Sequence, residues 1–240
     1  MKRKRGVIKT TWPDQLSLAH AVAHLVVLES KKAIAAKGFF SIALSGGSTP
    51  AMLYELLAKA PYRNNIDWRK TYVAFGDERF VPHSSDESNF KMANEALLKK
   101  VPLPRKNILA VTTTSMTPAA SAKAYELGIR KFVSAKEPFD LVLLGIGEEG
   151  HTASIFPGSV LISKRNWVAS VFVVEKNMER ISFTLPFINQ AKNVAFLVAG
   201  AGKANVVKQI FSTRKSKLPA ALVSAKETTY WFLDDPANGA

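Results

Sequence analysis

Residues 139–154 read FDLVLLGIGEEGHTAS, a short apolar run that stops at a turn rich in glycine and charge. The run over residues 139–144 is short for a helix and is typical of a buried strand. Similar runs over residues 39–44 and 71–75 also end at or near a glycine, and helix-length segments separate the runs. This alternation predicts an α/β fold, Rossmann-like, with a mostly parallel sheet and helices on both faces.

The same pattern continues along the chain. Further strands are predicted at residues 107–111, 167–174, 181–185, 193–199 and 228–233. Helices are predicted at residues 14–37, 50–59, 89–100, 118–135 and 202–211. No linker rich in proline and serine interrupts the sequence, so we expect a single domain over residues 1–240.

Composition and charge narrow the function classes. With 47% hydrophobic residues among 240, the chain is not a largely disordered one. The absence of cysteine excludes thiolate nucleophiles and Cys-ligated zinc. The net charge of +14 favours an anionic partner: nucleic acid, an anionic membrane or a phosphorylated metabolite.

Two of these partners find little support in the sequence. No run reaches the ~20 apolar residues of a membrane-spanning helix, and no nucleic-acid-binding motif is visible. The basic start, residues 1–5, has no persuasive cleavage site after it, so we expect an ordinary first helix and no signal peptide. We therefore expect a cytoplasmic protein, a monomer or weak dimer, with no membrane partner and no nucleic-acid partner.

The loops after the strands are the candidate functional segments, because parallel sheets bind ligands at the carboxyl ends of their strands. After residues 39–44 comes a turn that leads into a helix. Its glycines let the backbone approach an anion, and its hydroxyls and the helix N-terminus add donors. This turn is either a phosphate cradle or a plain strand-to-helix connection; its residues are Ser45, Gly46, Gly47, Ser48 and Thr49.

Charged residues follow two other strands. Asp77, Glu78 and Arg79 come after residues 71–75, where Arg79 can grip an anion and a neighbouring carboxylate can orient it. Lys203 opens a predicted helix, where a bound anion would offset its unfavourable place in the helix dipole. A surface ion pair and a solvated lysine are the simpler alternatives for these two segments.

His151 lies in the glycine-rich loop after residues 139–144. A histidine there can accept a proton near neutral pH, and a nearby carboxylate such as Glu149 can fix its tautomer. No metal-binding spacing such as His-Glu-x-x-His accompanies it, so we do not expect a metal site. Ser154 lies too close to His151 in sequence for a triad to be assigned.

Together these motifs resemble those of 6-phosphogluconolactonases, in the order of that family and over nearly the whole chain. The most specific is Gly-His-Thr-Ala-Ser-Ile-Phe-Pro-Gly-Ser. The matching segments are residues 44–50, 76–79 with 81–82, 88–89, 144–159, 180–185 and 202–203.

The resemblance implies the fold of sugar-phosphate isomerases and the hydrolysis of 6-phospho-D-glucono-1,5-lactone to 6-phospho-D-gluconate, in the oxidative pentose phosphate pathway. It implies no nucleotide cofactor and no catalytic metal. Carried onto this sequence, it makes His151 the base and makes Arg79, Arg180 and Lys203 anion contacts. Asp77 is expected to bind sugar hydroxyls or to orient Arg79.

Two differences bear on this resemblance. The family usually has Asp directly before the Gly-His pair, whereas this chain has Glu149, one methylene longer. The related glucosamine-6-phosphate deaminases carry a glutamate where this chain has Phe156, which cannot act as acid or base. The resemblance therefore implies a lactonase and not a deaminase.

Overall fold

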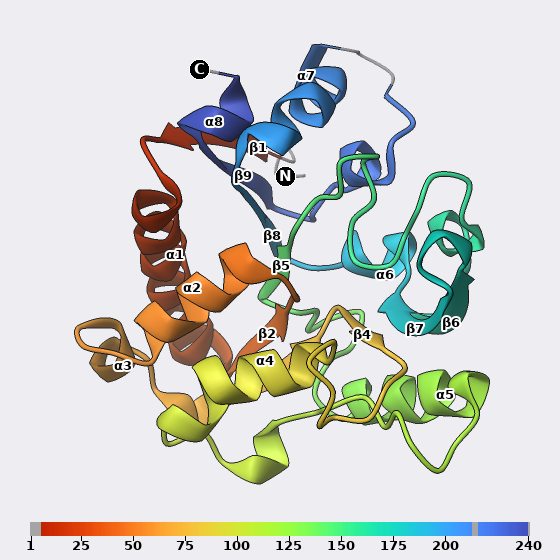
Figure 1. Cartoon of the computed structure of the whole chain (residues 1–240). Coiled ribbons are helices and arrows are strands. Elements are labelled where there is room, and N and C mark those ends of the chain that lie inside the picture. Colours follow the sequence, from red (N-terminus) through yellow and green to blue (C-terminus); the bar gives the residue numbers. More distant parts are fainter. Residues whose placement is uncertain (1–5, 213–215, 240) are drawn as a thin grey trace.

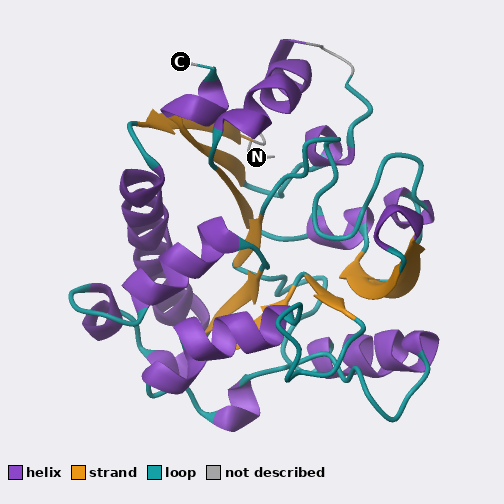
Figure 2. Ribbon diagram, in the orientation of Figure 1, coloured by secondary structure: helices purple, strands orange, loops and turns teal. Residues whose placement is uncertain are grey.

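The computed structural model describes residues 6–212 and 216–239. Residues 1–5 are the basic start that was considered as part of a signal peptide, and they lie outside the described residues. The chain forms a six-stranded sheet and a separate three-stranded sheet, with helices packed around them (Figures 1 and 2).

The large sheet is parallel at every pairing, in the order β1-β9-β8-β5-β2-β3. It therefore confirms the predicted mostly parallel α/β fold. Its strands are β1 (Gly6–Trp12), β2 (Phe40–Leu44), β3 (Thr71–Phe75), β5 (Leu141–Leu144), β8 (Asn193–Val198) and β9 (Thr228–Asp234).

The small sheet is antiparallel, in the order β4-β7-β6. Its strands are β4 (Asp77–Arg79), β6 (Val168–Val173) and β7 (Met178–Phe183). The predicted strands at residues 167–174 and 181–185 thus lie outside the parallel sheet. Only a short connection around Asn177, which has φ 45°, joins β6 to β7, and such a connection suits a hairpin but not a parallel crossover.

Helices cover both faces of the large sheet. The α-helices are α1 (Gln15–Lys37), α2 (Ser48–Leu57), α3 (Tyr62–Asn65), α4 (Asn89–Ala96), α5 (Pro118–Ile129), α6 (Leu185–Ile188), α7 (Ala204–Ser212) and α8 (Asp235–Asn238). The 3-10 turns are η1 (Trp68–Lys70), η2 (Leu98–Lys100), η3 (Arg105–Asn107), η4 (Val160–Ile162), η5 (Val174–Lys176), η6 (Ala201–Lys203) and η7 (Pro219–Leu222).

Side-chain alternation along β5 divides the core in two. Leu141 and Leu143 pack in the cluster formed with α1, α2 and α4, whereas Val142 and Leu144 pack in the cluster formed with α5 and α7. All four side chains are buried, as expected for a central parallel strand. In Figure 1, α1 and α2 lie on one side of the large sheet and α5 and the small sheet lie on the other.

Capping explains where the longest helix begins and ends. The side chain of Asp14 accepts a hydrogen bond from the backbone N–H of Ser17 at 2.7 Å. At the other end Gly38 adopts φ 86°, a left-handed conformation that glycine tolerates best. The predicted helix over residues 14–37 is thus confirmed to within one residue.

Two predicted elements differ most from the structure, and the helix predicted over residues 89–100 also ends early, at Ala96. The helix predicted over residues 118–135 ends at Ile129, directly after Gly128, and glycine is among the weakest helix formers. The segment at residues 107–111 is not a strand and shares only one bridge, Ile108 with Val73, with the sheet. Here the Asn107 side chain donates to backbone carbonyls near the start of β3, which substitutes for a strand ladder.

Candidate active site

A cavity of about 270 Å³ opens at the carboxyl ends of β2, β5 and β8 and is completed by the small sheet. Its walls therefore come from the strand ends that the topology of a parallel sheet places together. The lining residues are Ser45, Gly46, Gly47, Ser48, Thr49, Pro50, Asp77, Arg79, Asn89, Gly145, Ile146, Gly147, His151, Ala153, Arg180, Leu197, Val198, Ala199 and Lys203.

The turn between β2 and α2 forms one wall. The phenol of Tyr54 donates to the backbone carbonyl of Ser45 and accepts from its N–H, at 2.8 and 2.9 Å, which fixes the turn. Gly47 adopts φ 109° and directly precedes the first residue of α2. At Gly46 a Cβ atom would overlap the Asn89 side chain, so only glycine fits there. The N-terminus of α2 thus faces the cavity with its free backbone amides.

One hydroxyl in this wall is unused. The Oγ atom of Ser45 is buried, lines the cavity and has no hydrogen-bond partner. A buried hydroxyl without a partner costs free energy, so a ligand that accepts or donates there restores the lost hydrogen bond.

Arg79 and Arg180 form a second wall. They are directly opposite each other in the β4–β7 ladder, and both line the cavity. The Nε atoms of both side chains are buried without hydrogen-bond partners. Burial lowers the pKa of Arg180, the nearby charge of Arg79 acts in the same direction, and Asp77 opposes both.

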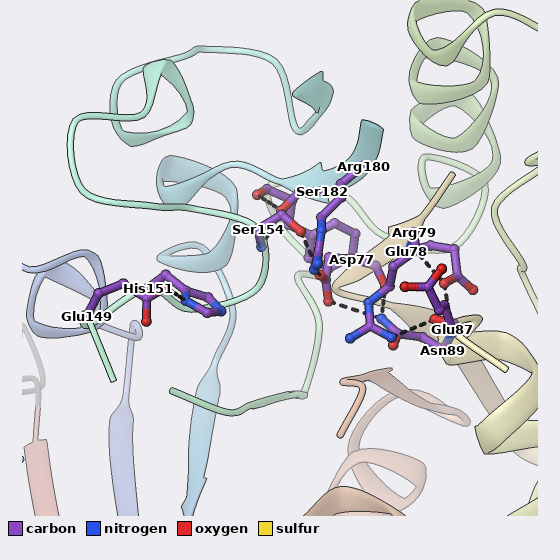
Figure 3. Close-up of polar contacts among 11 residues, drawn as sticks. Asp77, Glu78, Arg79, Glu87, Asn89, Glu149, His151, Ser154, Arg180 and Ser182 are labelled. Atoms are coloured by element: carbon purple, nitrogen blue, oxygen red, sulfur yellow. Dashed lines mark hydrogen bonds and ion pairs between the residues drawn. The ribbon is translucent and has the colours of Figure 1, made fainter. Parts of the chain in front are cut away.

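Asp77 is the counter-charge of Arg180. Its Oδ2 atom accepts a hydrogen bond from Ser154 Oγ at 2.7 Å and lies 3.8 Å from Arg180 Nη1 (Figure 3). Arg79 instead donates from Nη1 to the backbone carbonyl of Glu87 at 2.5 Å. The carboxylate of Asp77 therefore pairs with Arg180, where the sequence suggested Arg79 as its partner.

Glu78 plays a structural role. Its buried carboxylate accepts hydrogen bonds from the backbone N–H groups of Arg79, Asn89 and Phe90, and from Ser88 Oγ. These contacts join β4 to the first turn of α4. Burial raises the pKa of this carboxyl, and the three backbone donors lower it by less.

His151 lies on the loop after β5, across the cavity from the arginines. Its Nδ1 atom lies 3.0 Å from Glu149 Oε1, although the two are not aligned as a hydrogen bond. Partial burial raises the pKa of Glu149, but its own backbone amide and the charges of His151 and Lys203 prevail, so the net shift is downward. In Figure 3 the imidazole points from its loop toward the group around Asp77.

Lys203 follows β8 in the turn η6 and completes the cationic lining. Its Nζ atom lies 4.0 Å from Glu148 Oε1, a carboxylate whose side chain is 73% exposed. An ion pair this long and this exposed contributes little, so the ammonium is available to a ligand.

The structure thus brings every sequence-predicted site residue to one place, since all line the cavity except Glu149, which contacts His151. Two residues of the site were not singled out as functional from the sequence. Asn89 holds Asp77 through a hydrogen bond from Nδ2 to its backbone carbonyl, and Ser154 holds the Asp77 carboxylate. The only indication of their role in the sequence was that both lie in segments that match the family resemblance.

Within residues 6–212 and 216–239, no group of three or more histidine, aspartate or glutamate side chains could hold a metal ion. Over the same part of the chain no helix is both long and apolar enough to cross a membrane.

Comparison with known proteins gives consistent similarities. The profile of the family described as glucosamine-6-phosphate isomerases/6-phosphogluconolactonase matches residues 13–231. The chain is 40% identical over 232 residues to a 6-phosphogluconolactonase of Nostoc sp., covering 94% of this chain and 95% of that one. It is 38% identical over 202 residues to the 6-phosphogluconolactonase of Haemophilus influenzae, covering 82% and 85%.

Solved structures agree with these sequence matches. The 6-phosphogluconolactonase of Thermotoga maritima superposes with a TM-score of 0.83 at 32% identity, covering 95% of this chain and 100% of that one. That of Trypanosoma brucei gives a TM-score of 0.85 at 30% identity, covering 98% and 99%. A monomeric glucosamine-6-phosphate deaminase has a TM-score of 0.83 at 17% identity, a likeness of fold alone.

Proposed function

The chain belongs to the family of glucosamine-6-phosphate isomerases and 6-phosphogluconolactonases, and we propose that it hydrolyses its lactone by a water attack that His151 assists as general base. Within the family it is a lactone-hydrolysing enzyme, which converts 6-phospho-D-glucono-1,5-lactone to 6-phospho-D-gluconate in the pentose phosphate pathway. The observation that carries the mechanism is the shared cavity: an imidazole and three cationic side chains line one space.

The orientation of the imidazole assigns roles to its two nitrogens. The negative charge of Glu149, whose Oε1 lies 3.0 Å from Nδ1, favours the neutral tautomer with its proton on Nδ1. Nε2 is then the basic nitrogen. Glu149 also stabilises the imidazolium that forms when Nε2 takes up a second proton.

In the first step Nε2 takes a proton from a water molecule while the water oxygen bonds to the lactone carbonyl carbon. The negative charge moves to the carbonyl oxygen, which a backbone amide or a cationic side chain of the cavity wall can stabilise. The tetrahedral intermediate then breaks the bond between its central carbon and the ring oxygen. Nε2 returns its proton to that oxygen, which leaves a free hydroxyl and a carboxylic acid that ionises in water.

The phosphate is held by the other walls. The N-terminus of α2 offers amides and a partial positive charge, and Arg79, Arg180 and Lys203 add full charges. The hydroxyls of Ser45, Ser48 and Thr49 supply further donors. Each charge-assisted hydrogen bond contributes about 1.5–3 kcal/mol. Asp77 keeps Arg180 directed at the cavity and leaves Arg79 to the ligand.

A coupled assay tests this proposal. Glucose-6-phosphate dehydrogenase generates the lactone, and its disappearance is followed with and without the protein. We expect the protein to accelerate hydrolysis and His151→Ala to lower kcat by roughly 10²–10⁴-fold. A variant with the full parental kcat removes His151 from the mechanism. The same sample is tested on glucosamine-6-phosphate, for which we expect no deamination.

We also propose the domain extent, the location, the assembly and the partners of the protein. Residues 1–240 form one catalytic domain, because both sheets contribute side chains to the same cavity. The protein works in the cytoplasm as a monomer or weak dimer and binds no nucleic acid; its positive charge serves capture of the phosphorylated lactone. Sedimentation and a nucleic-acid titration at physiological salt check the assembly and the partner.

A further inference from the structure

The imidazole of His151 is stacked against an aromatic ring. The ring centroids of His151 and Phe156 lie 4.2 Å apart, and the two planes differ by 20°. Phe156 is half-buried and is not among the residues that line the cavity. It therefore contacts the imidazole without contacting the space that the substrate fills.

We propose that Phe156 is a positioning residue, which holds the imidazole of His151 in the orientation that general-base catalysis requires. The inference deepens the proposed function and rests on it. Phe156, Gly147 and Glu149 together form what we call the imidazole seat.

The backbone between His151 and Phe156 folds back on itself, which brings the two side chains together. Thr152 and Ile155 exchange two backbone hydrogen bonds, of 3.3 and 2.9 Å, which closes a tight turn between them. Ala153 takes φ 49° within this turn. Ser154 fixes the turn to the rest of the site through its 2.7 Å hydrogen bond to Asp77. The chain is thereby reversed, and residue 156 lies over residue 151.

The other two parts of the seat do not fix the ring by themselves. Gly147 leaves room for the Nδ1 edge of the imidazole, because a Cβ atom there would overlap Nδ1 and Cε1. Glu149 lies near Nδ1 but is not aligned as a hydrogen bond, and its side chain is 47% exposed. Rotation of the imidazole about its bond to Cβ is thus limited mainly by the flat face of Phe156.

Stacking also acts on the charge that the reaction creates. When Nε2 takes a proton from water, the imidazole becomes a cation over the negative face of the Phe156 ring, which attracts it. This attraction is stronger in the charged intermediate than in the resting state, so it favours kcat. Since Phe156 is outside the lining of the cavity, its removal leaves substrate binding largely unchanged.

The experiment compares four single variants in the coupled lactone assay. Phe156→Leu and Phe156→Met remove the aromatic face but keep an apolar side chain of useful size, so one remains if the other folds poorly. Phe156→Tyr keeps the aromatic face. Phe172→Leu is the matched control, because Phe172 is 48% exposed on β6 and lies outside the cavity lining.

We expect Phe156→Leu and Phe156→Met to lower kcat by roughly tenfold, with KM within about twofold of the parent. Phe156→Tyr and Phe172→Leu should keep kcat within about threefold. An unchanged kcat in the two non-aromatic variants overturns the inference, and so does a rise of KM alone.

A double-mutant cycle separates this inference from the proposed function. If Phe156 acts through the imidazole, Phe156→Leu causes no further loss of kcat in a His151→Ala background. An equal tenfold loss in both backgrounds shows that Phe156 acts elsewhere and overturns the inference alone. Full activity of His151→Ala instead overturns the proposed mechanism, whatever the cycle gives.

Discussion

Gly147→Ala adds one methyl group at the most crowded point of the site. The added Cβ would overlap Nδ1 and Cε1 of His151 and would lie 2.5 Å from Glu149 Oε2. Gly147 does not have a positive φ, so alanine fits its backbone without strain. The three atoms nearest to the added Cβ belong to these two side chains, so the steric conflict is first with the imidazole and the carboxylate.

The size of the effect follows from this geometry. The imidazole cannot stay where it is, and rotation into the open cavity is its easiest way out. A displaced base forfeits most of the 10²–10⁴-fold contribution of general-base catalysis, so we expect kcat to fall by roughly 10²-fold. Because the ring moves into open space, the free energy of unfolding should change by no more than about 1 kcal/mol.

The assay is lactone hydrolysis in steady state, with urea unfolding of the same samples. Gly145→Ala is the matched control, since a Cβ there meets nothing within 4 Å. It should keep kcat within about threefold, although as a lining residue it can raise KM. A Gly147→Ala enzyme with the parental kcat would falsify the assignment of the imidazole to its observed place.

Three further changes test other parts of the site. Glu149→Gln should lower kcat by only about fivefold, because a 3.0 Å pair that is half exposed contributes about 1 kcal/mol; a loss as large as that of His151→Ala contradicts this. Asp77→Asn removes the buried counter-charge of Arg180 and should lower the free energy of unfolding by about 3 kcal/mol, part of which excess inorganic phosphate restores; unchanged stability in urea refutes the pairing. Burial raises the pKa of Glu78 above its ordinary 4.5, so the folded state binds a proton more readily than the unfolded chain. Its contribution to stability is then complete below the ordinary pKa and declines as pH rises through the folded-state pKa. The stability of the parent relative to Glu78→Gln should accordingly fall as pH rises above the ordinary pKa of the carboxyl, and a rise with pH there contradicts the shift.

Strand ends were the most predictable part of the site. Each of the apolar runs at residues 39–44, 71–75 and 139–144 is a parallel strand in the large sheet, and parallel strands bring their carboxyl ends to one edge. The turn with Gly46 and the loop with His151 could therefore be placed together without knowledge of the coordinates.

Other features depend on contacts between distant segments. β1 was missed because its side chains are mostly exposed and give no apolar period. β4 is only three residues long and forms through pairing with β7, more than a hundred residues later. The pairing of Asp77 with Arg180 follows from that ladder, whereas the sequence suggested the neighbour Arg79.

The stacking of Phe156 on His151 also could not be read from spacing. Residues five apart meet neither on a helix nor across a strand, and here a tight turn with a positive φ at Ala153 brings them together. The contact depends on the backbone geometry of this turn, which the spacing of residues in the sequence does not reveal.

A crystal structure with 6-phosphogluconate bound tests the central claim most directly, since that claim assigns one ligand to all walls of the cavity. We expect the phosphate at the N-terminus of α2, within hydrogen-bond distance of Arg79, Arg180 or Lys203. The carboxylate carbon, which was the lactone carbonyl carbon, should lie beside Nε2 of His151 with room for one water molecule. A ligand bound with its carboxylate remote from His151, or bound outside this cavity, contradicts the account.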